Sequence, residues 1–315
     1  MPIPAQPVLF TPAYQVRVWG GRRIETALGR SLPDAQPYGE SWEMSDRDDC
    51  QSRAAEGPLA GMTLNDLWNK HRPAIFGTSL AAHPSRRFPL LIKVLDCAAD
   101  LSIQVHPPAS RAAELGGEPK SEMWYVADAE PGALLYAGLR AGVTRDGFRR
   151  ALADGTVAEC IHSMKAVPGN SLMVHSGRVH ALGSGLLVFE IQQNSDTTYR
   201  VFDWNRNGLD GKPRQLHIKE SMQCIDFDDF EPQLHPADAG NPLADCDHFT
   251  VNLRQPGDPM HGGDDTMSLL MAVTPLKWGG IPIPAGAVAL WPACQSPAPA
   301  PEGGEGGKWL EIHVR

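Results

Sequence analysis

The sequence lacks the features that mark exported, membrane-spanning and disulfide-stapled chains. Its first residues, "MPIPAQPVLFTPAYQVRVWGG", contain no basic segment followed by an apolar one. No stretch supplies the roughly 18 consecutive apolar residues of a membrane-spanning helix. The six cysteines are scattered and form no C-x-x-C pair, which predicts free thiols. We therefore expect a cytoplasmic protein with no membrane partner.

An excess of positive charge is also missing. The formal net charge is -9 at pH 7, whereas nonspecific binding of nucleic acid requires a basic face. We therefore expect no nucleic-acid partner. Because the chain is acidic overall, an anionic small ligand would need a local pocket of cationic side chains.

Long helical segments are few, and short apolar runs are many. The 28 prolines and 31 glycines are spread between these runs, which is typical of a mainly antiparallel β protein. We expect helices to begin at Thr63, after Pro108 and at Thr144, the last with helical spacing through residues 144–166. The candidate strands are "FPLLIKVLD", "SEMWYVAD", "GALLYAGL", "NSLMVHSG", "GLLVFEIQQ" and "TYRVFDW".

A change of composition past about residue 225 predicts two unequal domains. The segment "CIDFDDFEPQLHPADAGNPLADCDHF" is acidic and rich in proline, as at an interdomain crossing. We therefore expect a larger domain over residues 1–235 and a smaller β domain over residues 236–315. The smaller one ends on the strand "KWLEIHVR".

Several metal-binding residue types occur on the predicted strands. In "LSIQVHPP", Gln104 and His106 are two residues apart and share one strand face. Glu122 lies in "KSEMWYV", and His175 and His180 flank a turn in "VHSGRVHALGSG". An amide, a carboxylate and imidazoles without thiolates suit Zn²⁺ or another first-row divalent ion. The alternative for "LSIQVHPP" is a sheet face exposed to water. Three roles are open for His175: no role at the site, support of a ligand residue, or an additional metal ligand.

Six motifs occur together in one order. They are "WGGRR", "GESWEMSD", "LIKVLDCAADLSIQVHPP", "KSEMWYV", "GRVHALGSG" and "EIQQNSDTTYRVFDWNR". Together they resemble the type I phosphomannose isomerases in their short bacterial form, from about Trp19 to Arg206. The resemblance implies a mainly β cupin fold of antiparallel barrels, with a few helices, a metal-binding first domain and a smaller second β domain. It also implies one zinc ion per chain and interconversion of mannose 6-phosphate and fructose 6-phosphate, so the expected partner is a phosphorylated hexose.

The resemblance assigns roles to individual residues. Gln104, His106, Glu122 and His180 fall on the family's metal ligands. Ser102 and Lys120 fall on positions that line the sugar-phosphate pocket. Lys93 is expected to join them, because a buried lysine seldom lacks an anionic partner. We expect Lys93 and Lys120 to supply much of the positive potential that holds the phosphate.

The implied reaction requires an acid/base group and a group that stabilises an enediolate. Glu190 in "LLVFEIQQ" is the favoured acid/base residue, and the alternative is a structural partner of Arg200 or of a lysine. Arg200 is expected to act in the chemical step together with Lys120. The alternative for Arg200 is a structural salt bridge with Glu190 or Asp203.

Two other functions compete with the isomerase. Two histidines and a carboxylate also describe the ligands of non-haem iron dioxygenases, a different class of cupin. Gln104 and the cationic pair Lys93 and Lys120 argue against that class. A sugar-binding cupin without activity is the other alternative, and the presence of Arg200 and of the four ligands argues against it.

Overall fold

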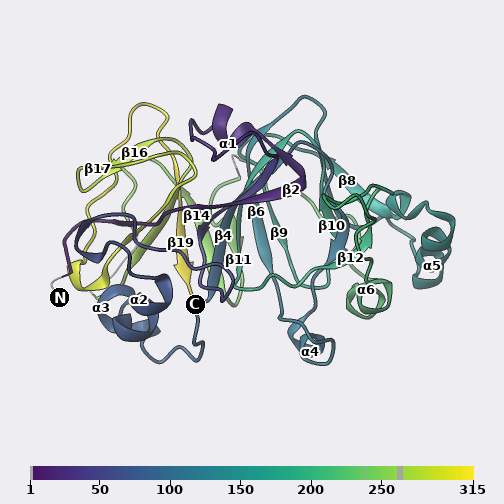
Figure 1. Cartoon of the computed structure of the whole chain (residues 1–315), viewed down its shortest axis with the longest axis horizontal. Coiled ribbons are helices and arrows are strands. Elements are labelled where there is room, and N and C mark those ends of the chain that lie inside the picture. Colours follow the sequence, from purple (N-terminus) through teal and green to yellow (C-terminus); the bar gives the residue numbers. More distant parts are fainter. Residues whose placement is uncertain (1–2, 238, 261–264) are drawn as a thin grey trace.

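The strands of the described residues form three antiparallel sheets and one separate hairpin (Figure 1). The computed structural model describes residues 3–237, 239–260 and 265–315. The predicted mainly antiparallel β fold is confirmed, and each candidate strand run contains an observed strand.

Sheet I is the central sheet, and its strands pair antiparallel with one another. In spatial order they are β2 (Ala13–Gly21), β3 (Tyr38–Met44), β4 (Leu90–Cys97), β11 (Leu186–Gln193), β6 (Glu122–Ala129) and β9 (Ser171–Val174). Valine, leucine, isoleucine and aromatic residues dominate β4 and β11, which occupy the middle of the sheet and are buried almost throughout.

Sheet II packs against one face of sheet I. Its strands are β12 (Tyr199–Phe202), β5 (Ile103–Val105), β10 (His180–Leu182), β7 (Leu134–Leu139) and β8 (Ile161–Lys165). One hydrophobic cluster joins Leu95, Trp124 and Val188 of sheet I to Leu135 and Leu182 of sheet II. These two sheets therefore enclose a common interior, as expected of a cupin barrel.

Sheet III contains the C-terminal strands and packs near the opposite face of sheet I. It consists of β1 (Val8–Leu9), β18 (Val288–Trp291), β15 (Ser268–Ala272), β19 (Trp309–Val314), β14 (Phe249–Arg254) and β13 (Ala244–Asp245). The hairpin is β16 (Leu276–Trp278) with β17 (Ile281–Ile283). Val94 and Phe189 of sheet I share a core with Phe249 and Leu310 of sheet III. The division at residues 235 and 236 stays a prediction; the first strand of the chain, β1, pairs with β18.

The helices are short and lie outside the sheets (Figure 1). They are α1 (Arg23–Thr26), α2 (Leu64–Lys70), α3 (Arg72–Phe76), α4 (Ala109–Ala112), α5 (Arg145–Asp154) and α6 (Ile218–Cys224). The predicted starts are confirmed: Thr63 and Thr144 cap α2 and α5 through their hydroxyls, and α4 follows Pro108. In the described parts of the chain, no helix is long and apolar enough to cross a membrane.

The prediction of one helix through residues 144–166 is wrong beyond Asp154. Gly155 adopts a left-handed conformation at φ 74°, and its N–H bonds to the carbonyls of Ala151 and Leu152, which ends α5. The rest of the segment forms a short 3₁₀ turn and then β8, which pairs with β7. Pairing with a sheet edge therefore outweighs the helical spacing in this segment.

Candidate metal centre and adjoining pocket

Strand register brings the polar residues of the two facing sheets together. In sheet I, Glu190 of β11 pairs directly with Lys93 of β4. In sheet II, Gln104 of β5 pairs with His180 of β10 on one side and with Arg200 of β12 on the other. Because side chains alternate between faces along a strand, the sheet I residues share a face with the Leu95 and Val188 side of the core.

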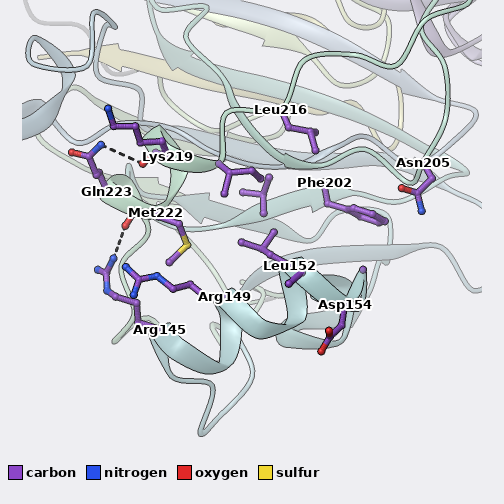
Figure 2. Close-up of a pocket in the computed structure, with 14 residues that line it drawn as sticks. Arg145, Arg149, Leu152, Asp154, Phe202, Asn205, Leu216, Lys219, Met222 and Gln223 are labelled. Atoms are coloured by element: carbon purple, nitrogen blue, oxygen red, sulfur yellow. Dashed lines mark hydrogen bonds between the residues drawn. The ribbon is translucent and has the colours of Figure 1, made fainter.

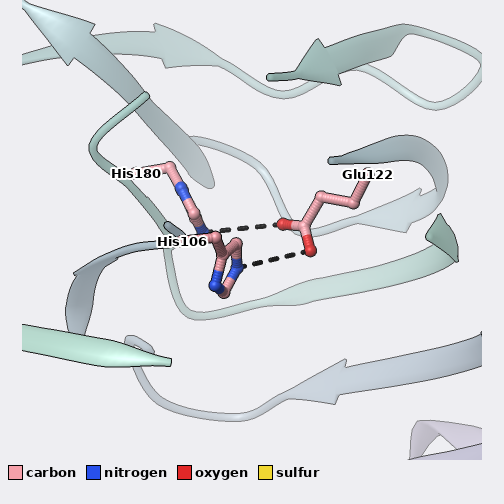
Figure 3. Close-up of side chains that lie close together, drawn as sticks. All are labelled: His106, Glu122 and His180. Atoms are coloured by element: carbon pink, nitrogen blue, oxygen red, sulfur yellow. Dashed lines mark ion pairs between the residues drawn. The ribbon is translucent and has the colours of Figure 1, made fainter. Parts of the chain in front are cut away.

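His106, Glu122 and His180 form a compact buried group at this interior (Figure 3). Their ligand atoms all lie within 4.8 Å of one another. The Nε2 atoms of His106 and His180 are each 3.5 Å from an oxygen of Glu122. Each of the three residues is at most 1% exposed. Glu122 comes from sheet I, His180 from sheet II, and His106 directly follows β5 of sheet II.

Backbone carbonyls determine the tautomer of both imidazoles. Nδ1 of His106 donates to the carbonyl of Thr197 at 2.8 Å, and Nδ1 of His180 donates to the carbonyl of Arg178 at 2.8 Å. Burial lowers the pKa of both histidines, and for His180, with His106 as the next cause, it lowers the pKa to about 3. A neutral imidazole has one N–H, so both Nε2 atoms direct lone pairs toward Glu122.

Three electron-rich groups therefore face one another with no proton between them. Nε2 of His106 is buried without a hydrogen-bond partner, which costs about 1–3 kcal/mol, whereas Oε2 of Glu122 lies 2.7 Å from the ammonium of Lys120. A divalent cation would satisfy Nε2 of His106 and would also bind Glu122 and Nε2 of His180. Two nitrogens and one carboxylate without thiolates are a donor set that zinc accepts. The residues present thus fit the expected metal.

Gln104 lies beside this group and remains a predicted fourth ligand. Its Nε2 is 3.3 Å from Nε2 of His180, and its Oε1 accepts a hydrogen bond from Ser102 at 3.2 Å. A half-turn of the amide would exchange these two atoms and direct Oε1 at the metal position. His175 is exposed and does not belong to the buried group.

A pocket of about 240 Å³ adjoins the metal group. Six residues that the sequence assigned to the site line this pocket, and the three residues of the buried metal group are not among them. The six are Lys93, Ser102, Gln104, Lys120, Glu190 and Arg200.

Both lysines of the pocket have carboxylate partners. Nζ of Lys120 is 2.7 Å from Glu122, and Nζ of Lys93 is 3.5 Å from Glu190 and 3.9 Å from Asp196. Burial alone would lower the pKa of Lys120, but Glu122 and then Glu190 outweigh it and raise that pKa. The lysine charges are therefore largely compensated, and their role toward a phosphate stays a prediction.

Arg200 differs from the lysines because it has no carboxylate partner. Among the ion pairs of residues 3–237, 239–260 and 265–315, none involves Arg200; Asp203 instead binds Arg206 and Arg214. The Nε of Arg200 is buried without a hydrogen-bond partner. The alternative of a structural salt bridge with Glu190 or Asp203 is therefore not observed, and Arg200 has donors to offer to a bound anion.

Glu190 is a buried carboxyl group with one oxygen available. The indole N–H of Trp124 donates to Oε2 at 3.3 Å, and Oε1 has no hydrogen-bond partner. Burial and then the charge of Glu122 raise the pKa of Glu190, although Lys120 and Lys93 oppose the shift. A carboxyl with a raised pKa in a pocket is a chemically reasonable acid/base group. Its proximity to Lys93 also fits a role as the structural partner of a lysine. Both the acid/base role and the structural role of Glu190 therefore stay predictions.

Sequence reasoning did not place five further polar residues in the pocket, namely Arg17, Glu40, Asp196, Thr198 and Arg214. Arg17 binds both oxygens of Glu40, at 3.0 and 3.1 Å. Burial would raise the pKa of Glu40, but Lys93 and Arg17 outweigh it and lower that pKa to about 2. The available signal was the polar alternation of Glu40 in "GESWEMSD", and only the pairing of β2, β3 and β4 brings it beside Lys93.

Comparisons with known proteins agree with this geometry. Residues 8–137 match the family model described as phosphomannose isomerase type I, catalytic domain. The chain is 41% identical over 221 residues to "Probable mannose-6-phosphate isomerase GmuF" of Bacillus subtilis, covering 70% of this chain and 68% of that protein. It is 36% identical over 258 residues to mannose-6-phosphate isomerase ManA of the same species, covering 78% of each. The crystal structure of the mannose 6-phosphate isomerase from Bacillus subtilis superposes with a TM-score of 0.80 at 28% identity, covering 98% of this chain and 100% of that one.

The buried group generates a prediction about metal content. His180→Ala should reduce bound zinc from about one ion per chain to a small fraction, because it removes one of three converging ligands. Metal analysis of the dialysed protein measures this directly, and circular dichroism verifies that the variant is folded. His175→Ala is the matched control and should retain the metal, since His175 is exposed. Full metal content in folded His180→Ala would show that the site is misassigned.

Glu40 generates a prediction about pH. Its folded-state pKa of about 2 lies below its ordinary value of 4.5, so its stabilisation is complete above about pH 5 and is lost as the pH falls toward 2. Glu40→Gln should lower the free energy of unfolding at pH 7 by about 3 kcal/mol. Urea unfolding should show this deficit shrinking below pH 4.5. The control Glu25→Gln removes an exposed ion pair with Arg22 and should cost under about 1 kcal/mol. A deficit for Glu40→Gln that is constant from pH 7 to pH 3 would contradict the assignment.

Proposed function

This chain belongs to the type I phosphomannose isomerases, a family of enzymes, and we propose that it interconverts mannose 6-phosphate and fructose 6-phosphate. The observation that carries the proposal is a metal-type ligand group directly beside a pocket that contains a buried carboxyl of raised pKa and an unpaired guanidinium. Relatives that bear this enzyme name cover more than two thirds of the chain. We further propose that the protein holds one zinc ion per chain and acts in the cytoplasm.

The reaction moves a proton between two neighbouring carbons. In the aldose-to-ketose direction a base takes the proton from C2, and the electron pair of that C–H bond forms the C1–C2 double bond. The C1 carbonyl oxygen then carries negative charge until it is protonated. Loss of the O2 proton and delivery of a proton to C1 complete the ketose, so no external oxidant or reductant is needed.

Glu190 is proposed to exchange the carbon-bound proton. Its Oε1 lies 3.5 Å from Nζ of Lys93 and 4.0 Å from Nζ of Lys120 without a hydrogen-bond partner, and burial raises its pKa above the ordinary value. Lys120 is proposed to move or stabilise protons on the sugar oxygens, since it lies between Glu122 and Glu190. A zinc ion bound by Gln104, His106, Glu122 and His180 would supply Lewis acidity toward a substrate oxygen.

Substrate binding is proposed to involve the remaining polar groups of the pocket. Ser102 offers a hydroxyl that now donates to Gln104. Lys93 and Lys120 are proposed to contact the phosphorylated sugar when its oxygens displace part of their carboxylate contacts. Among the described residues the guanidinium of Arg200 forms no ion pair with a carboxylate, so it can stabilise the enediolate oxygens as charge develops on them.

The activity is tested with purified protein and a coupled assay that detects fructose 6-phosphate. We expect turnover of mannose 6-phosphate by the zinc-loaded protein, loss after chelation and recovery when zinc is added back. Free mannose is the control substrate and should react far more slowly, because it cannot use the charge-assisted contacts to phosphate. No turnover by folded, zinc-loaded protein would refute the proposal.

Arg200→Lys separates a role in the chemical step from a role in binding. Lysine retains the charge but loses the planar array of donors, so we expect kcat to fall about 100-fold or more while KM changes little. Steady-state kinetics of the zinc-loaded variant measures both constants. The control is Arg206→Lys, whose arginine pairs with Asp203 and should tolerate the change. Near-normal kcat with a raised KM in Arg200→Lys would make Arg200 a binding residue.

A further inference from the structure

A second and larger hollow lies among α5, β12 and α6 (Figure 2). Its volume is about 1120 Å³. We call it the α5–α6 groove. Strand β12 separates it from the candidate active site: Arg200 lines the active-site pocket, whereas Val201 and Phe202 line the groove. The register of β12 shifts between Arg200 and Phe202, which lets neighbouring residues face two different cavities.

The middle of the groove is apolar and open to solvent. Leu152 of α5, Phe202 of β12 and Met222 of α6 line it together with Leu216 from the loop that precedes α6 (Figure 2). Leu216 is 43% exposed, although it lies beside other apolar side chains. An apolar surface of this kind is stabilised when a ligand removes it from water.

One end of the groove is cationic. Arg145, Arg149 and Lys219 lie at this end, and Asn205 and Asp154 lie toward the other (Figure 2). The guanidinium of Arg145 is held in place by the carbonyl of Met222 at 2.5 Å and by the ring of Phe227 at 4.3 Å.

The other two cations of this end are available to a ligand. Within the described part of the chain, the ion-pair partner of Arg149 is exposed Asp146, at 3.3 Å. No ion pair of Lys219 occurs within the described ranges. Because the whole chain carries a formal net charge of -9, a local group of three cations attracts anions to this position specifically.

We propose that the α5–α6 groove binds a small amphipathic anion, namely an apolar ring system or chain that carries one anionic group. The apolar body would cover Leu152, Leu216 and Met222, and the anionic group would lie between Arg149 and Lys219. Ligand sites are typically concave and mainly apolar, with a few polar groups that set orientation, which describes this groove. The proposal does not depend on the isomerase activity.

The test uses 8-anilinonaphthalene-1-sulfonate, which joins apolar rings to one sulfonate. Fluorescence titration and equilibrium dialysis with the full-length, zinc-loaded protein should show saturable binding of one probe per chain. Leu216→Glu should weaken binding at least 10-fold, because it places a carboxylate in the apolar part. Leu209→Glu is the matched control and should bind normally, since Leu209 is an exposed leucine of the same loop, 63% exposed, that does not line the groove.

A second pair of variants tests the cationic end. Arg149→Glu should weaken binding at least 10-fold, whereas Arg150→Glu should not, because Arg150 is an exposed neighbour on α5 outside the groove. The uncharged analogue N-phenyl-1-naphthylamine should bind wild-type protein at least 10-fold more weakly than the sulfonate. All four substitutions alter exposed side chains, and circular dichroism verifies their folding.

Three results would overturn the proposal. The first is probe binding that does not saturate, and the second is binding that Leu216→Glu and Arg149→Glu leave unchanged. The third is a dimer in sedimentation experiments that dissociates in Leu216→Glu but persists in Leu209→Glu. That result would make the groove an interface between two copies of the chain.

Discussion

The candidate site depends on one electrostatic constraint: two imidazole lone pairs and a carboxylate face one another at a buried position. Carbonyls of Thr197 and Arg178 hold the imidazoles in the tautomer that directs Nε2 inward. Burial keeps both rings neutral by lowering the pKa of each histidine. Lys120 compensates the charge of Glu122, whereas the buried Nε2 of His106 has no hydrogen-bond partner and would gain one when a cation binds.

The charges around this group form a compensated network. Lys120 joins the ligand Glu122 to Glu190, and Lys93 joins Glu190 to Asp196. Near Lys93, the carboxylate of Glu40 accepts a hydrogen bond from Arg17, and its pKa is lowered. Each buried charge therefore has an opposite partner nearby, which offsets the cost of removing it from water. Arg200 is the exception among the pocket residues discussed, and its guanidinium is correspondingly suited to an incoming anion.

The two faces of sheet II differ in polarity and in what they pack against. Its inner side meets sheet I and carries Gln104 and His180 beside polar and ionised partners. Its outer side packs against α5 and α6 through Val201, Phe148 and Met222, and leaves an apolar groove with a cationic end. The backbone of Arg200 exchanges hydrogen bonds with His217, the residue directly before α6. The two cavities therefore share a structural wall.

The sequence by itself determined the class of fold, the positions of most strands and the identity of the metal-type donors. Alternation along "LSIQVHPP" and "KSEMWYV" places polar side chains on one face, because a strand has a period of two residues. Helix starts at Thr63 and Thr144 were also readable, since the capping hydroxyl acts over three residues.

Only the tertiary structure decided which distant groups meet. Glu40 and Arg17 reach Lys93 through the pairing of β2, β3 and β4, and no local pattern encodes that pairing. The same holds for the lack of an ion pair between Arg200 and a carboxylate within the described residues, and for the strand that replaces the expected helix after Gly155. Local patterns report the preference of a segment, whereas contacts between segments far apart in sequence determine its partners, its burial and its pKa values.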